Sequence, residues 1–253
     1  MEKKIKKYLQ ELEVEKNIEI LFACETGSRA WGFPSPDSDY DVRIIYRHPK
    51  EWYLSLKEGK DSIDCFYEDN EIDISGWELR KCLRLLSKSN PPLLERIQSP
   101  IIYKIHDDFQ QKISSIAPDF YARIATIYHY SSMGKKILSE IIDTKEYKLK
   151  KLFYALRSSV ACLWILEKET SPPIEFEKML GALDIPQVLK ERIHQLIDLK
   201  SVSNESYLHT GDRELLQFIK FSLEKADANA KDLPGAKGDF SKLDLFFRNY
   251  LPL

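Results

Sequence analysis

The feature that most limits how this chain can fold is a change of pattern between residues 105 and 118. Before it, short apolar stretches rich in β-branched and aromatic residues alternate with turn-forming residues, and after it only helical periodicity continues. The chain has 253 residues, which is enough for two modest domains. We therefore predict an α+β domain over residues 1–110, with a mixed sheet and flanking helices, followed by an α-helical domain over residues 111–253.

The expected elements follow from this pattern and from its breaks. The first part predicts strands over residues 18–24, 39–46, 62–67, 71–75 and 101–104, and helices over residues 3–13, 51–56, 77–87 and 93–98. The second part predicts only helices, over residues 119–142, 146–168, 186–200, 205–231 and 243–250. No strand is expected after residue 104, so the second domain should be entirely helical.

Charge and composition narrow the function classes. Lys and Arg number 38 against 40 Asp and Glu, so the net charge is −2 and any contact with a polyanion must come from a local patch. The N-terminal residues are too charged for a secretory signal, and the longest apolar run, residues 160–166, is far shorter than the ~20 residues that span a bilayer. We expect a soluble cytoplasmic protein with no membrane partner. Its four scattered cysteines indicate reduced thiols rather than structural zinc: Cys24, Cys65, Cys82 and Cys162.

Three acidic residues suggest a metal site. Asp39 and Asp41 are two residues apart on a predicted strand, so both project from one face with Cα atoms about 6.6 Å apart. Such carboxylates repel each other unless a cation lies between them, and oxygen ligands favour Mg²⁺ or Mn²⁺. Asp73 lies between two isoleucines on a later strand, where burial penalises a lone charge unless something cationic faces it.

A Gly-Ser pair supplies a candidate phosphate-binding turn. Gly27 and Ser28 end the first predicted strand and open a helical turn, where free N–H groups and a hydroxyl can hold a phosphate. Combined with the three acids, this turn resembles the parts of a two-metal phosphoryl or nucleotidyl transfer site. Gly-Ser and Asp-x-Asp are each common by chance. Their order, with Asp39 eleven residues after Ser28 and a third acid on another strand, is much more specific.

The chain resembles the DNA polymerase beta superfamily of nucleotidyltransferases, and within it the RNA-ligase-associated (RlaP-like) branch. The matching segments are residues 25–33 (ETGSRAWGF), 38–43 (SDYDVR), 72–77 (IDISGW), 79–81 (LRK), 88–91 (KSNP) and 151–157 (KLFYALR). The resemblance implies a polymerase-beta-type nucleotidyltransferase domain followed by a helical domain, and transfer of a nucleoside monophosphate from an NTP, such as ATP, with two Mg²⁺ or Mn²⁺ ions. By matching position, Asp39, Asp41 and Asp73 would be the metal ligands and catalytic residues, and Gly27, Ser28 and Arg29 would contact the nucleotide.

Basic and aromatic residues on two helices are further nucleotide-binding candidates. Arg80 and Lys81 lie on the helix after the third acid, where a solvated helix face is the alternative. Lys150, Tyr154 and Arg157 follow at helical spacing and could meet phosphates and a stacked base, or could form an ordinary exposed side with the tyrosine partly packed.

The sequence predicts an enzyme of the nucleotidyltransferase class (EC 2.7.7 type). The acceptor hydroxyl could belong to an RNA end, as in RNA repair or modification, to a protein or to a small molecule. Two alternatives remain: a non-catalytic nucleotide-binding regulatory module, and metal-dependent hydrolysis of a phosphodiester. No Gly-x-x-x-x-Gly-Lys loop and no Gly-x-Ser-x-Gly elbow occurs, which argues against P-loop ATPase and α/β-hydrolase chemistry.

Overall fold

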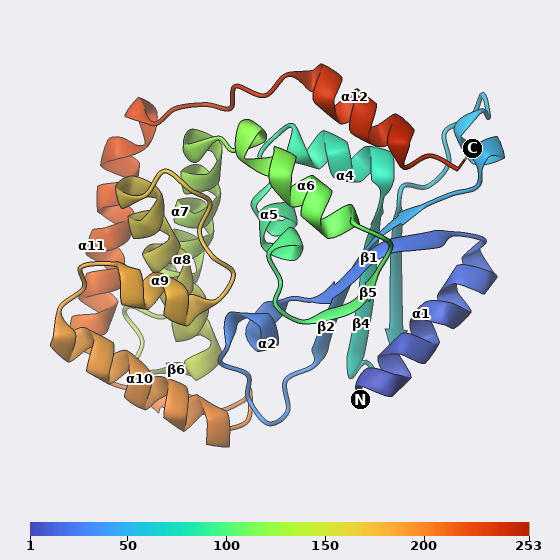
Figure 1. Cartoon of the computed structure of the whole chain (residues 1–253). Coiled ribbons are helices and arrows are strands. Elements are labelled where there is room, and N and C mark those ends of the chain that lie inside the picture. The colour runs from blue at the N-terminus through green and yellow to red at the C-terminus, as the bar shows by residue number, and fades with distance from the viewer. Residues whose placement is uncertain (253) are drawn as a thin grey trace. The chain divides into compact units, whose positions relative to one another are not determined.

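The computed structural model describes residues 1–252 and divides into two compact units (Figure 1). The first unit comprises Met1–Ala30, Asp39–Tyr121 and a C-terminal segment that begins at Ala236. The second comprises Trp31–Ser38 and Ala122–Gly235. This division differs from the single boundary expected after residue 110. Residues 111–121 stay with the first unit, residues 31–38 belong to the second, and the segment from Ala236 belongs to the first.

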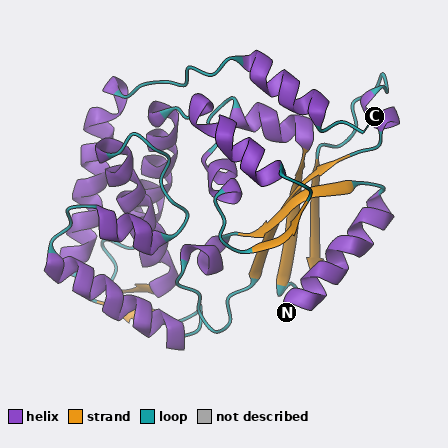
Figure 2. Ribbon diagram, in the orientation of Figure 1, coloured by secondary structure: helices purple, strands orange, loops and turns teal. Residues whose placement is uncertain are grey.

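A five-stranded mixed sheet forms the centre of the first unit, as the sequence predicts (Figure 2). The strand order is β3-β4-β2-β1-β5, with bounds β1 Glu19–Glu25, β2 Tyr40–Arg47, β3 Ser62–Tyr67, β4 Ile72–Glu78 and β5 Ile102–Ile105. The β2–β4 pair is parallel, and the other three pairs are antiparallel. Residues 68–70 form the turn between β3 and β4, and all three have positive φ.

Helices cover this sheet with two separate apolar cores. One core is built on α1, Glu2–Lys16, whose Ile5, Leu9 and Leu12 are buried with inward residues of β1, β2 and β4. The other is built on α4 Leu79–Leu86, α5 Pro91–Ile97, α6 Phe109–Ile116, the 3-10 turn η1 Ala117–Phe120 and α12 Phe240–Asn249. Two further short helices occur in the N-terminal half of the chain, α2 Gly27–Trp31 and α3 Lys50–Tyr53. Alternation along the strands directs successive side chains to the two cores.

The second unit is mostly helical. Its core is shared by α7 Arg123–Ser139, α8 Leu149–Glu167, α9 Phe176–Ala182, α10 Gln187–Val202 and α11 Arg213–Asn229, which is followed by the 3-10 turn η2 Ala230–Asp232. It also contains one short antiparallel pair, β6 Glu146–Lys148 with β7 Leu208–Thr210. The helical domain is thus present as predicted, but the expectation of no strand after residue 104 was wrong. Strands of three residues are too short to show alternation in the sequence, and their pairing depends on contacts between distant segments.

Residues 31–38 belong to the helical unit although they connect α2 to β2 in the first unit. Phe33 is 3% exposed, and its ring centroid lies 4.9 Å from that of Phe153 on α8. The Lys200 ammonium donates to the Ser35 hydroxyl at 2.8 Å, and the Glu205 backbone N–H donates to Asp37 at 2.9 Å. The segment that joins the Gly-Ser turn to the acidic strand is thus held by the helical core.

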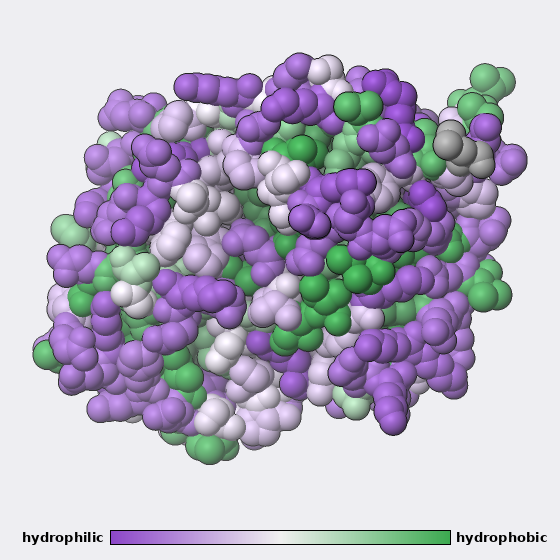
Figure 3. Space-filling model, viewed as in Figure 1, coloured by the Kyte–Doolittle hydropathy of each residue, from purple (hydrophilic) through white to green (hydrophobic). Residues whose placement is uncertain are grey.

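Hydrophilic side chains cover most of the face seen in Figure 3, and apolar ones form smaller groups among them, one of them right of centre. Within residues 1–252, none of the helices combines the length and apolar character needed to cross a bilayer. All four cysteines are free thiols, and three of them are buried.

Candidate active site

Two of the three predicted acids face each other across neighbouring strands. Asp41 on β2 and Asp73 on β4 are partners in the parallel register, so their side chains project from the same face of the sheet. Both are partly exposed, at 26% and 24% of the side-chain surface. The fold therefore brings these carboxylates together from positions 32 residues apart in the sequence.

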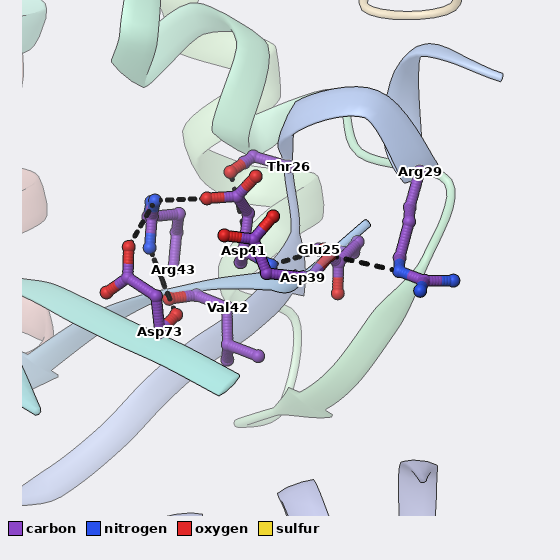
Figure 4. Close-up of polar contacts among 8 residues, drawn as sticks. All are labelled: Glu25, Thr26, Arg29, Asp39, Asp41, Val42, Arg43 and Asp73. Carbon is purple, nitrogen blue, oxygen red and sulfur yellow. Dashed lines mark hydrogen bonds and ion pairs between the residues drawn. The ribbon is translucent and has the colours of Figure 1, made fainter. Parts of the chain in front are cut away.

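Arg43 lies between these two carboxylates. Its Nη2 atom is 2.6 Å from Asp41 Oδ1 and 2.9 Å from Asp73 Oδ2 (Figure 4). Its Nη1 atom donates to the main-chain oxygens of Val42, at 3.2 Å, and Asp73, at 3.1 Å. The cation that the sequence requires opposite Asp73 is thus supplied by the chain itself.

Asp39 lies just before β2 rather than on it, and it is exposed. Its main-chain oxygen accepts a hydrogen bond from Arg29 Nε at 3.1 Å. The Arg29 guanidinium also stacks on Tyr40, 3.8 Å from the ring centroid. Arg29 therefore fixes the backbone at the entrance to β2, next to the acid pair.

The Gly-Ser turn is attached directly to the acidic strand. Thr26 donates to the main-chain oxygen of Asp41 through its backbone nitrogen, at 2.9 Å, and through its hydroxyl, at 3.1 Å. Gly27 follows with φ +61°, and a Cβ atom added there would lie 2.0 Å from Asp41 Oδ2. Only glycine lets the turn approach the Asp41 carboxylate this closely. Ser28 is the second residue of α2.

Glu25 is a buried carboxyl group beneath this site, which sequence reasoning missed. It accepts a hydrogen bond from the backbone nitrogen of Asp41, at 2.7 Å, and one from the Tyr103 hydroxyl, at 2.5 Å. Burial raises its pKa from the ordinary 4.5 to about 7, although both hydrogen bonds act in the opposite direction. The sequence signal that could have identified Glu25 is an acidic residue at the end of the apolar run over residues 18–24. The role of Arg43 was also missed, although its position two residues after Asp41 places both on one strand face.

Replacing Glu25 with glutamine is expected to change how stability depends on pH. Because the folded state holds the Glu25 proton more tightly than the unfolded state, this group stabilises the fold fully below pH 4.5 and loses that contribution as pH rises through about 7. Urea unfolding measures the free energy of unfolding at pH 5 and at pH 8. Its decrease from pH 5 to pH 8 should be smaller in Glu25→Gln than in the wild type by roughly 2–3 kcal/mol. Glu51→Gln, at an exposed position, is the control. Equal losses in Glu25→Gln and the wild type would contradict the assignment.

Arg80 and Lys81 lie in the first turn of α4, which follows directly after the strand that carries Asp73. The Arg80 guanidinium lies 5.4 Å from the ring centroid of Tyr53 and 5.3 Å from that of Phe247. Lys81 forms an ion pair with Asp61 at 2.8 Å. Both side chains thus have partners within the first unit, and their role in nucleotide binding stays a prediction.

Lys150, Tyr154 and Arg157 lie on α8 of the helical unit. Lys150 pairs with Glu205 at 2.5 Å, and the Tyr154 ring packs edge-on against Trp31 at 5.0 Å. Arg157 is 2% exposed, with its guanidinium 4.4 Å from the Trp31 ring centroid. The three therefore do not form one open face, and their contact with a nucleotide stays a prediction.

The carboxylate pair suits a divalent ion in its chemistry. Asp41 and Asp73 present oxygen ligands from adjacent strands, as Mg²⁺ and Mn²⁺ prefer. Across residues 1–252, however, no three His, Cys, Asp or Glu side chains are gathered as a ready ligand group. The Arg43 guanidinium takes the place between the two carboxylates instead.

A Gly-Ser turn attached to an acidic strand, with a third acid on the neighbouring strand of a mixed sheet, is the arrangement of a nucleotidyltransferase-type domain. The comparison with protein families agrees: the chain belongs to the RlaP family, described as the RNA repair pathway DNA polymerase beta family, whose sequence profile matches residues 1–249. The recognition and fold class expected from the sequence are confirmed.

Two known proteins are similar to this chain. The uncharacterized protein YcgL of Bacillus subtilis (strain 168) is 39% identical over 241 residues, which cover 95% of this chain and 92% of that protein. A crystal structure of a nucleotidyltransferase-like protein from Exiguobacterium sibiricum 255-15, at 1.90 Å resolution, matches at 13% identity. That match covers 90% of this chain and 75% of the other, with a TM-score of 0.33.

Proposed function

We propose that the protein is a metal-dependent nucleotidyltransferase that moves a nucleoside monophosphate from an NTP to an acceptor hydroxyl. The observation that carries this proposal is the convergence of Asp41 and Asp73 beside the Gly27 turn, in a chain whose family match spans residues 1–249. The acceptor oxygen attacks the α-phosphorus, the bond from the α-phosphorus to its bridging oxygen breaks, and pyrophosphate leaves.

The proposal assigns separate tasks to the residues of the site. Asp39, Asp41 and Asp73 would hold two Mg²⁺ or Mn²⁺ ions, which supply positive charge to the phosphates when bound. Asp73 would also accept the proton of the acceptor hydroxyl. Gly27 and Ser28 would hold the β- and γ-phosphates, because the glycine leaves the backbone accessible. Arg29 would steady this end of the site through the main chain of Asp39.

An RNA end is the acceptor that we favour, because the family description refers to RNA repair. The net charge of −2 requires a local basic surface for that contact. Free cysteines are consistent with a cytoplasmic location. One observation favours a second candidate: the Arg43 ion pairs satisfy both acids without a metal, as a non-catalytic nucleotide-binding module would allow.

Incubation with each α-labelled NTP tests the proposal. The protein is mixed with Mg²⁺ or Mn²⁺ and a pool of small RNAs, and the label is then sought in RNA, protein and small molecules. We expect label in RNA with the wild type and none with Asp41→Asn. Label in protein or in a small molecule would change the acceptor class. Metal-dependent NTP binding without transfer would favour the regulatory module, and hydrolysis of RNA without label incorporation would favour a phosphodiesterase.

A further inference from the structure

The guanidinium of Arg43 makes four polar contacts. Its Nη2 atom is shared by Asp41 and Asp73, at 2.6 and 2.9 Å, and its Nη1 atom bonds two main-chain oxygens. The side chain is 18% exposed, so the ion pairs are partly shielded from water. Partial burial strengthens such charge-assisted hydrogen bonds relative to those on an open surface.

Electrostatics explains why a cation is needed there. Asp41 and Asp73 are opposite each other on strands that lie about 4.8 Å apart, where two like charges repel. Glu25, which accepts a hydrogen bond from the backbone nitrogen of Asp41, is itself an acid and supplies no positive charge. Arg43 is on the same strand face as Asp41, and its length lets the guanidinium reach both carboxylates.

A divalent ion shared by Asp41 and Asp73 would be attracted by the same negative charge as the Arg43 guanidinium. It would also occupy the same region between the carboxylate oxygens. We propose that Arg43 is an internal counter-ion that competes with the divalent ion for these two carboxylates. This inference rests on the proposed function, since it assumes that the pair binds metal. In the metal-free protein Arg43 holds the two acids together, and metal binding requires the guanidinium to give up its contacts with them.

The competing explanation is that Arg43 supports metal binding by orienting the carboxylates. The two explanations predict opposite effects of removing the charge. If Arg43 competes, Arg43→Gln should bind Mn²⁺ more tightly, whereas if it orients the ligands the variant should bind more weakly. Mn²⁺ titration followed by electron paramagnetic resonance measures free and bound ion directly and needs no turnover.

We expect Arg43→Gln to lower the Mn²⁺ dissociation constant about tenfold or more, because a unit positive charge is removed within hydrogen-bond distance of both carboxylates. Arg43→Lys keeps the charge and should bind close to the wild type. Arg47→Gln is the matched control, since Arg47 lies on the same strand but pairs with Glu19 at 2.6 Å. Equal or weaker binding by Arg43→Gln overturns the inference. Absence of Mn²⁺ binding in both the wild type and Arg43→Gln overturns the metal site and the inference together.

The thermal stability of the metal-free protein tests the counter-ion role of Arg43 separately from the metal site, and it does not depend on the reaction. Without metal, Arg43→Gln should unfold at a lower temperature than the wild type, and adding Asp73→Asn to it should restore part of the loss by removing the repulsion. In the wild-type background Asp73→Asn should instead lower the melting temperature. The inference is contradicted if Asp73→Asn has the same effect in both backgrounds, whatever the activity measurements show.

Discussion

Replacing Asp41 with asparagine is expected to abolish nucleotidyl transfer while the protein stays folded. Asp41 links the turn to the acid pair: Gly27 approaches its carboxylate, and Arg43 pairs with it across from Asp73. Asparagine keeps the shape but removes one negative charge and one anionic ligand. We expect the rate of label transfer to fall by about a thousandfold or more, as losses of electrostatic stabilisation in active sites reach this size.

The control for Asp41→Asn is Asp64→Asn on strand β3 of the same sheet. Asp64 is exposed and pairs in the strand register with Ser75 rather than with either acid, so its loss should leave the transfer rate unchanged. Circular dichroism and a melting curve show whether each variant is folded. A folded Asp41→Asn protein that transfers at the wild-type rate would remove Asp41 from the mechanism, and with it the proposed site.

Replacing Gly27 with alanine is expected to damage both stability and activity. The backbone at Gly27 has φ +61°, which costs an alanine about 1 kcal/mol. The added Cβ would also lie 2.0 Å from Asp41 Oδ2 and 2.9 Å from its Cγ, so the carboxylate that pairs with Arg43 through Oδ1 must shift. We expect unfolding free energy to fall by roughly 1–3 kcal/mol and transfer to fall by about a hundredfold or more.

Gly211→Ala separates the two causes. Gly211 also has positive φ, +94°, but a Cβ atom there would meet nothing within 4 Å. Its substitution therefore carries the backbone cost without displacing a neighbour, and transfer should be unaffected. Urea unfolding and label transfer are measured for both variants. If Gly27→Ala loses no more activity than Gly211→Ala, the close approach of the turn to Asp41 has no functional role.

Much of the fold was accessible from the sequence because it depends on local patterns. Apolar runs with β-forming residues predicted the five strands of the sheet, and the Glu68-Asp69-Asn70 turn signalled the hairpin. The α7, α8, α10, α11 and α12 helices occur where helical periodicity predicts them, with different ends. The residue order from Gly27-Ser28 to Asp73 also indicated the family, which the profile match confirms.

The assignment of segments to domains required the tertiary structure. Residues 31–38 look like an ordinary loop, yet Phe33 is buried among the helices of the second unit. The C-terminal helix α12 continues a helical stretch of sequence, yet Leu243 and Phe246 are buried in the core of the first unit. Burial of an apolar side chain favours whichever core accepts it, and local sequence does not identify that core.

The sequence by itself predicted that three acids, a Gly-Ser turn and strands belong to one kind of site, because the spacing of residues along a chain specifies strand faces and turns. Tertiary structure alone decided what lies between Asp41 and Asp73. Strand order and register place the two carboxylates opposite each other, and the guanidinium of Arg43 lies between them and pairs with both. Pairing between strands joins residues distant in sequence, so the electrostatics of the site follow from the fold rather than from the motif.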